Sequence, residues 1–495
     1  MAELSRDKTR WIVTGLCALA GIRVFVFAAA FPFFNNVDEQ AHVDLVVKYA
    51  HAQWPRGIEN YSNESARYFT LYSSPEYFLK PDQFGGQYPS PNWTLSPNKR
   101  QQALDAEVPI WESRPNHESG EPPLYYTIAG AWMNLGRIFG LRELSLLYWT
   151  RFLNIIFAAA LVWIGFATAR STFPDNQFLP IGIAALLAIW PQSAFYSIQA
   201  DALSPICFAI AFLGLARFLK EDRPNVLIAL WIGLATAATC LVKTANLPLL
   251  FVVAFAMIAK TLRWRKEIGQ ALLALGAFVL AAAIPIGIWF VHNLRHFGDL
   301  TATTAKIEML QWTQKTFSDW WSHPIFSLDG LGEFWSGLIA SFWRGEFVWH
   351  LQRMASSPAD AFYAISSAVV IVAAILFLLR RSAELKDRQL TLWLALLSFL
   401  SIVAFLILLS IEFDFGNSPY PSREHPYFTS GRLLDAAAVP FFLIFVFVVD
   451  RFSNWMKREW LGWVLVGATA LFLSISQIQI NAPAFSSRYN FFHRP

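Results

Sequence analysis

Two adjacent carboxylates, Asp38 and Glu39, follow the first long apolar run of the sequence. They open a predicted amphipathic helix that extends to about Ala52. Both would lie near the positive end of its dipole, which favours the ionised, proton-accepting form of a carboxylate. One interpretation of the pair is therefore a general base. The alternative is structural, with Asp38 capping the helix and Glu39 in its first turn.

Other polar residues interrupt the apolar pattern where later apolar runs begin or end. They are Asp201, Lys243, His292, Asn293, Arg295 and Arg432. Ionisable groups at membrane depth are costly and usually line a cavity or pair with one another. A single polar cavity on one side of a membrane would explain them together.

Three of these residues are cations at the ends of three different apolar runs: Lys243, Arg295 and Arg432. If they converge, with few acids to compensate them, they would suit the phosphate of a lipid. For each cation singly, contact with ordinary phospholipid headgroups is the alternative. Their convergence is the prediction that a structure can test.

Two arginines lie inside apolar runs. Arg151 is about five residues into its run, roughly one and a half turns from the end. An unpaired guanidinium there would be costly, so we expect a carboxylate partner, either Glu39 or Asp38, with snorkelling to the headgroups as the alternative. Arg23 is in the middle of the first run and needs a partner inside the bundle.

The segment from His117 to Tyr126 combines a histidine and two acids with a rigid Pro122-Pro123 entry into a helix. These side chains, and Tyr125 after the prolines, could contribute to a site. Alternatively, Pro123 is a first-turn proline and the tyrosines are interface anchors. Both interpretations can hold at once.

The composition indicates which elements position these residues. Of 495 residues, 55% are hydrophobic and 15% are charged, whereas soluble domains average about 25% charged residues. An ordinary soluble enzyme is excluded, and a net charge of +4 is too small to suggest nucleic-acid binding. The three cysteines all lie in apolar runs, so we expect neither a disulfide nor a cysteine metal site.

Twelve apolar runs are long enough, or nearly so, to cross a bilayer. They lie at about 11–34, 122–139, 146–169, 178–196, 200–219, 226–243, 246–260, 268–291, 359–380, 390–411, 433–450 and 459–479. Lys and Arg are retained on the cytoplasmic side of short loops, so intervals between basic clusters must hold an even number of crossings. Only the interval from Arg10 to Arg170 holds three. The short run at 122–139, which carries Asn134 and Arg137, is therefore expected to lie on the membrane surface.

The predicted fold is an all-α polytopic membrane protein with about eleven spans, a cytoplasmic N-terminus and an outward C-terminus. Its expected segments are the N-terminus with the first span (1–34), a first outward loop with juxtamembrane helices (35–145), spans two to seven (146–291), a second, Trp-rich outward loop (292–358), and spans eight to eleven with a tail (359–495). The tryptophans of the second loop favour the headgroup zone, so we expect short helices lying on the membrane there.

Several short motifs in this order resemble the GT-C superfamily, whose multi-pass glycosyltransferases use polyprenyl-phosphate sugars. Protein O-mannosyltransferases and the lipid A aminoarabinose transferase are members, and a bacterial branch is nearest. The motifs are Val37-Asp38-Glu39-Gln40-Ala41-His42, Glu121-Pro122-Pro123-Leu124-Tyr125-Tyr126, Arg151-Phe152-Leu153-Asn154, Gln199-Ala200-Asp201-Ala202-Leu203, Leu241-Val242-Lys243-Thr244, the run from His292 to Asp299, and Gly431-Arg432-Leu433-Leu434.

The resemblance implies an inverting sugar transfer from a polyprenyl-phosphate donor to a hydroxyl acceptor on the outer face of the plasma membrane. The acceptor would be a cell-envelope glycan, a lipid or a protein. Asp38 would be the general base, and Arg151 would hold Glu39. Donor phosphate and substrate would be bound by Lys243, Arg295, Arg432, His292, Asn293, His117, Tyr125 and Asp201. No cofactor is implied, although the outward acids could hold a divalent cation.

Two other functions stay open from the sequence. A transporter or flippase would need polar positions through the membrane midplane, whereas Arg23 is the main charge far from an outer end. A non-catalytic scaffold of the same fold could recruit a partner for cell-envelope assembly. The intact Asp38-Glu39 pair weighs against the scaffold.

Overall fold

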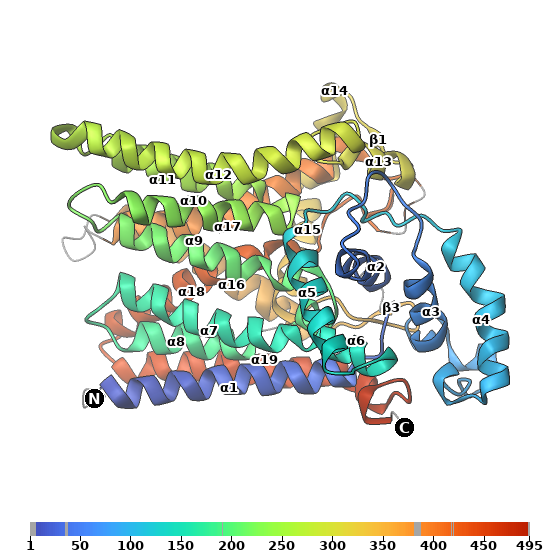
Figure 1. The fold of residues 1–495 in the computed structure, drawn as a ribbon. Coiled ribbons are helices and arrows are strands. Elements are labelled where there is room, and N and C mark those ends of the chain that lie inside the picture. Colours follow the sequence, from blue (N-terminus) through green and yellow to red (C-terminus); the bar gives the residue numbers. More distant parts are fainter. Residues whose placement is uncertain are drawn as a thin grey trace.

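The computed structural model describes residues 6–34, 38–190, 192–380, 388–416, 418 and 420–493, and this part of the chain is mostly helical (Figure 1). Long helices run side by side along one axis and form a bundle. Shorter helices cover one end of the bundle, and the two chain termini lie at opposite ends of it. The all-helical prediction is confirmed, and the opposite termini agree with an odd number of crossings.

Within the described residues, eleven helices form the bundle. They are α1 (Arg6–Ala30), α7 (Leu153–Thr172), α8 (Phe178–Ile189), α9 (Ser204–Phe218), α10 (Val226–Val242), α11 (Leu247–Thr261), α12 (Ile268–His296), α16 (Ser357–Leu379), α17 (Gln389–Glu412), α18 (Ala438–Trp455) and α19 (Glu459–Ser486). Counted with adjoining turns, nine described helices are long and apolar enough to cross a membrane, whereas α8 and α10 are shorter. Each of the eleven runs expected to span coincides with one of these helices.

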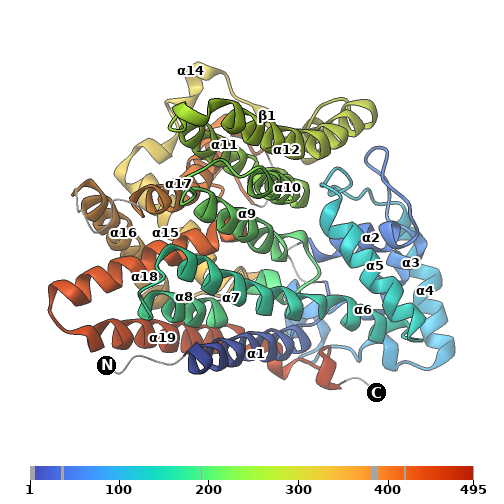
Figure 2. The ribbon, with the colours of Figure 1, turned by 60° about the vertical axis from the view of Figure 1, so that its left-hand side comes forward.

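The remaining helices and strands mostly build the covered end (Figure 2). The helices, with η for a 3-10 helix, are α2 (Glu39–Ala50), α3 (Asn63–Tyr72), η1 (Pro75–Tyr77), η2 (Pro81–Phe84), η3 (Asn92–Thr94), α4 (Pro97–Glu112), α5 (Leu124–Ile138), α6 (Glu143–Arg151), η4 (Ser193–Phe195), η5 (Ala200–Ala202), η6 (Thr244–Asn246), η7 (Arg265–Glu267), α13 (Thr303–Leu310), α14 (Phe317–Trp320), η8 (Pro324–Phe326), α15 (Leu328–Arg344), η10 (Gly431–Ala437) and η11 (Phe491–His493). Strand β1 (Thr313–Gln314) pairs antiparallel with β4 (Phe413–Asp414), and β2 (Val348–Trp349) pairs antiparallel with β3 (Gln352–Arg353).

The surface of the bundle is apolar where it would face lipid. Phe251 on α11 is 72% exposed, and Leu273 and Ile288 on α12 are exposed as well. Helix α18, by contrast, is buried along nearly its whole length and packs against α8, α16, α17 and α19. Continuous exposed apolar surface of this kind is expected for helices that contact lipid and unusual for a soluble protein.

Local sequence signals set the helix ends that carry polar residues. Asn225 caps α10, and its side-chain oxygen accepts hydrogen bonds from the backbone N–H groups of Leu227 and Ile228. At the other end of α10 the chain becomes extended at Lys243. Helix α9 begins with a proline in its first turn, directly after the 3-10 turn that contains Asp201. Polar residues are thus placed at the ends of the spans.

Helix α5 was expected to lie on the membrane surface, and Figure 1 shows it across the end of the bundle, steeply inclined to the spans. Helix α5 packs closely on α2 at Gly130, which has no side chain. A Cβ at this position would lie only 2.8 Å from the backbone nitrogen of Ala50. Helix α5 is clamped to α6 by stacked indoles of Trp132 and Trp149, each of which donates to the other's backbone carbonyl at 2.8 Å.

Two details differ from the sequence predictions. The run at 146–169 is broken at Phe152, so Arg151 ends α6 and lies at a bend before the span α7. In the second loop, α15 does not lie on the membrane surface. Its Leu338 and Trp343 are fully buried, and the Trp343 indole donates to Ser367 on α16 at 2.9 Å. The tryptophan-rich composition indicated interface anchors, but Trp343 and Trp349 are buried, whereas Trp321 is 65% exposed.

Candidate active site

The predicted acid pair lies at the covered end of the bundle, where the chain enters α2. Asp38 has left-handed backbone angles, φ 59° and ψ 19°, and its side chain makes no capping hydrogen bond to the helix. About a third of the side chain is exposed. Val37 of the same motif lies outside the described residues. Because Asp38 does not cap α2, its carboxylate is free to interact with other parts of the chain.

Glu39 forms the predicted ion pair with Arg151, and both side chains are fully buried. Arg151 Nη2 donates to the two carboxylate oxygens at 2.7 and 2.9 Å. The same carboxylate accepts the backbone N–H groups of Phe34 at 2.8 Å and Ile198 at 2.9 Å. The pair therefore joins the end of α1, the start of α2 and the loop before α9, and it fixes the position of the neighbouring Asp38.

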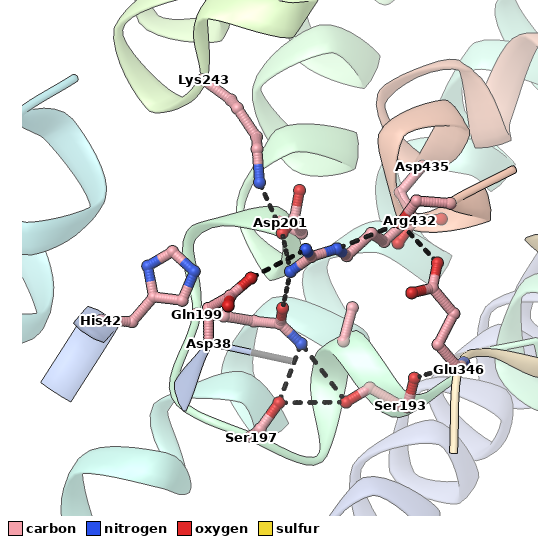
Figure 3. Close-up of polar contacts among 12 residues, drawn as sticks. Asp38, His42, Ser193, Ser197, Gln199, Asp201, Lys243, Glu346, Arg432 and Asp435 are labelled. Atoms are coloured by element: carbon pink, nitrogen blue, oxygen red, sulfur yellow. Dashed lines mark hydrogen bonds and ion pairs between the residues drawn. The ribbon is translucent and has the colours of Figure 1, made fainter. Parts of the chain in front are cut away.

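Two cations from different spans meet near Asp38 (Figure 3). Arg432 Nη2 lies 3.2 Å from Asp38 Oδ2, and Arg432 Nη1 lies 3.6 Å from Asp201 Oδ2. Lys243 Nζ lies 2.8 Å from the same Asp201 oxygen. Asp201 thus holds both cations within reach of one point, directly beside the Asp38 carboxylate.

Charged groups from the loops continue this arrangement on the other side of Asp38. His117 Nε2 lies 3.3 Å from Asp38 Oδ1 and 3.3 Å from Glu118 Oε1. Lys306, on α13, lies 2.8 Å from Glu118 Oε1 and 3.7 Å from Glu121 Oε1. We call the resulting run of alternating charges the charge chain: Glu121, Lys306, Glu118, His117, Asp38, Arg432, Asp201 and Lys243.

These contacts shift the protonation of the loop residues. Burial raises the pKa of Asp38, but the hydrogen bond from His117 and the charge of Arg432 outweigh it, so the pKa falls well below its usual value. Burial lowers the pKa of His117, but hydrogen bonds to Asp38 and Glu118 raise it to about 9. At neutral pH, Asp38 is therefore ionised and His117 carries a proton. Burial, followed by the charge of Glu118, raises the pKa of Glu121 to about 7.

Comparison with known sequences assigns the chain to a family. A family model described as "Predicted membrane protein (DUF2142)" matches residues 22–415. The chain belongs to the DUF2142 family. No curated protein sequence matches it.

Three solved structures of oligosaccharyltransferases from Archaeoglobus fulgidus are similar to the chain. One, in complex with Zn and sulfate, has 11% identity and a TM-score of 0.46, over 96% of this chain and 53% of that one. The oligosaccharyltransferase AglB in complex with an inhibitory peptide and a dolichol-phosphate has 12% identity and a TM-score of 0.47, over 97% of this chain and 56% of that one. An oligosaccharyltransferase in the apo form has the same identity and TM-score, over 97% of this chain and 57% of that one. This chain spans about half their length.

In this DUF2142 member, the structure places at the candidate site a residue, His42, that sequence reasoning did not single out. His42 is fully buried one turn after Asp38 on α2, and its Nδ1 lies 2.7 Å from the Tyr126 hydroxyl. Burial lowers the pKa of His42 to about 4, so the ring is neutral, and Figure 3 shows it beside the charge chain. The spacing of four residues places His42 on the same helix face as Asp38. This spacing from Asp38 was the feature of the sequence that could have marked His42 as a site residue.

Several buried polar atoms around the charge chain have no hydrogen-bond partner among the described residues. They are Asp201 Oδ1, Glu118 Oε2, Glu121 Oε2 and His42 Nε2. Buried polar atoms are normally paired, so a cluster of unpaired ones indicates groups that a ligand would satisfy. Three of the four are carboxylate oxygens, which suits a ligand rich in hydroxyl donors.

A divalent cation would also fit part of this cluster. One ligand atom each from Asp38, His117 and Glu118 lies within 4.8 Å of the others. Carboxylate oxygens and an imidazole nitrogen are suitable ligands for such an ion. Because His117 is protonated at neutral pH, metal binding there would have to displace its proton.

Other predicted site residues lie outside the charge chain. Arg295 is exposed near the end of α12 and makes no recorded ion pair or hydrogen bond within the described residues. His292 Nε2 contacts the Pro55 carbonyl at 3.2 Å, and Asn293 Nδ2 donates to the Leu300 carbonyl at 3.0 Å. Tyr125 is buried edge-on against Tyr126. Of the three cations expected to converge, the structure brings Lys243 and Arg432 together. The expectation that few acids would compensate them is wrong, because Lys243 pairs with Asp201 and Arg432 pairs with both Asp38 and Asp201.

Proposed function

We propose that this protein is a membrane glycosyltransferase that transfers a sugar from a polyprenyl-phosphate donor to an acceptor hydroxyl, with inversion at the anomeric carbon. One observation carries the proposal. The ionised and partly exposed Asp38 carboxylate contacts Arg432, and Asp201 joins Arg432 to Lys243, a cation of another span, at the covered end of a membrane bundle. A base next to cations that can bind a phosphate is what this transfer requires.

Donor binding would activate the base. With Arg432 and His117 beside it, Asp38 is a weak proton acceptor. A donor phosphate that binds to Arg432 and Lys243 would compensate the charge of Arg432 and so raise the pKa of Asp38. Asp38 would therefore become a competent base only when the donor is in place.

The lipid chain of the donor has a suitable path beside Lys243. A cavity of about 430 Å³ begins at Thr244, the next residue. It is lined by apolar side chains of α11, α13 and α17, and Glu308, Gln314 and Glu412 form a polar part of its wall. Among the apolar residues are Leu247, Ile307, Phe405 and Leu409. Threonine hydroxyls line the α13 side of the same cavity. An isoprenoid chain would lie among the apolar residues with its phosphate at Lys243.

The reaction then follows from the geometry. The acceptor oxygen attacks the anomeric carbon, and its proton passes to Asp38. The bond from that carbon to the phosphate oxygen breaks, and its electron pair stays on the phosphate. Arg432 and Lys243 stabilise the charge that develops on the departing polyprenyl phosphate. Attack from the face opposite the phosphate inverts the configuration.

This scheme needs no cofactor. A divalent cation bound by Asp38, His117 and Glu118 would supply further positive charge near the phosphate. The exposed Arg295 has no part in the proposed donor site. We place the site on the outer face of the plasma membrane, because the basic loops after α7, α9 and α11 lie at the opposite end of the bundle (Figure 1). Loops 35–145 and 292–358 then form the outward part.

The test is turnover by the purified full-length protein in lipid nanodiscs. Radiolabelled polyprenyl-phosphate hexose, N-acetylhexosamine and pentose donors are supplied, and release of polyprenyl phosphate is measured. We expect turnover of at least one donor, and loss of it in Arg432→Met. The matched control is Arg67→Met, an exposed cation on α3. If the wild type turns over none of these donors, or if Arg432→Met works as well as Arg67→Met, the proposal is wrong.

A further inference from the structure

A second cavity lies at the covered end of the bundle, apart from the charge chain. It is an open groove of about 450 Å³ between the η1–η2 segment of the first loop and the β2–β3 hairpin of the second. Its lining includes Phe78, Lys80, Asp82, His350, Leu351 and Gln352. A groove of this volume is large enough for about two to three sugar rings.

The tip of the hairpin is held in a conformation that its residues disfavour. His350 and Leu351 have φ values of 54° and 59°, whereas two-residue hairpin turns of this kind usually contain Asn-Gly. Their N–H groups donate to the carbonyls of Glu76 at 3.0 Å and Tyr77 at 2.9 Å. These bonds sustain the conformation and hold both side chains at the groove, with Leu351 70% exposed.

The hairpin is connected to Asp38 through a short series of contacts. Ser430 donates to Glu346, just before β2, and Arg432 Nε donates to the Ser430 hydroxyl at 3.2 Å. Arg432 in turn contacts Asp38. The strand rises about 3.4 Å per residue, so the tip at His350 lies within about 14 Å of Glu346. The hydrogen bonds of Ser430 to Glu346 and Arg432 therefore link the base of the hairpin to the charge chain.

We propose that this groove binds the acceptor and that the acceptor is a neutral glycan. The inference rests on the proposed glycosyltransferase function. The faces of Phe78 and His350 can pack against the apolar faces of sugar rings, and the Gln352 amide can bond to hydroxyls. The charges of Lys80 and Asp82 compensate each other, so the groove favours neither an anionic nor a cationic ligand.

Other acceptors fit the groove less well. A peptide that adds to the hairpin as a strand would need free backbone donors, but the N–H groups at the tip are already bonded to the first loop. A lipid chain would leave Lys80, Asp82 and Gln352 facing an apolar ligand. A ligand with both hydroxyls and apolar ring faces satisfies the whole lining.

The test measures binding separately from catalysis, on the full-length protein in detergent. The probes are maltotetraose, chitotetraose and α-1,6-mannotetraose, with tetraalanine for comparison. We expect at least one glycan to bind, and Phe78→Ala and Gln352→Ala each to weaken that binding by about tenfold. Phe317→Ala, an exposed aromatic on α14, is the control and should bind like the wild type.

Two outcomes overturn the proposal. One is wild-type protein that binds none of the three glycans, or that binds tetraalanine in their place. The other is glycan binding that Phe78→Ala and Gln352→Ala leave unchanged. Normal glycan binding without turnover of any donor would instead refute the glycosyltransferase function and show that the groove binds glycan for another purpose. The two proposals therefore fail in distinguishable ways.

Discussion

Removal of Arg151 should destabilise the protein strongly, although its side chain is not proposed to touch substrate. The guanidinium makes three hydrogen bonds to Glu39 and three to the backbone carbonyls of Ala28, Phe31 and Pro32. In Arg151→Met, the Glu39 carboxylate would stay buried without its counter-charge. Breaking a buried pair in this way costs about 3–5 kcal/mol.

The assay is equilibrium unfolding in mixed micelles, followed by tryptophan fluorescence. A double-mutant cycle with Glu39→Gln isolates the pair, and we expect a coupling of about 2 kcal/mol because the double variant leaves no buried charge. Arg137→Met is the matched control, since Arg137 pairs with a partly exposed Glu64 and should cost at most about 1 kcal/mol. Equal losses in Arg151→Met and Arg137→Met, or additive effects in the cycle, would refute the reasoning.

Three further predictions follow from the site and its support. His117 has a folded pKa of about 9, against 6.5 when unperturbed, so its contacts should stabilise the protein fully below pH 6.5 and progressively less up to pH 9. The melting temperature of the wild type should therefore fall between pH 6.5 and pH 9. The melting temperature of His117→Gln should not fall over that range. Lys243→Met should raise the KM for the donor at least about tenfold, because a charge-assisted contact to phosphate is lost; an unchanged KM would remove Lys243 from the donor site. Gly431→Ala should lower the melting temperature far more than Gly467→Ala. A Cβ on Gly431 would lie 1.9 Å from the backbone of α15, whereas a Cβ on Gly467 would have no atom within 4 Å. Equal melting temperatures of the two variants would contradict this packing.

Sequence reasoning was successful for a charge inside an apolar run. Arg151 was expected to pair with Glu39 or Asp38, with snorkelling as the alternative, and the structure pairs it with Glu39. Lys243 and Arg432 meet at Asp201, as expected for cations at the same ends of their spans, whereas Arg295 lies at the end of its span and does not join them. Arg23 also has a neighbour inside the bundle, the ring of Phe27 at 4.9 Å.

Contacts that depend on how long loops fold could not be predicted. Lys306 joins Glu118 across 188 residues, and no pattern around Lys306 marks it as part of a site. From the sequence, Trp343 cannot be told apart from a tryptophan at the membrane interface. It is buried because α15 packs between other helices. The break between α6 and α7 at Phe152 could not be predicted either, because neither a proline nor a glycine marks it in the sequence.

The most direct test of the central claim is sugar transfer by Asp38→Asn, which keeps the shape of the side chain but cannot accept a proton. We expect normal folding and donor binding, with transfer reduced by about 100-fold or more, as for the loss of a general base. Asp105→Asn, an exposed acid on α4, should transfer like the wild type. Transfer by Asp38→Asn within a few-fold of the wild type would contradict the role of Asp38 as the base.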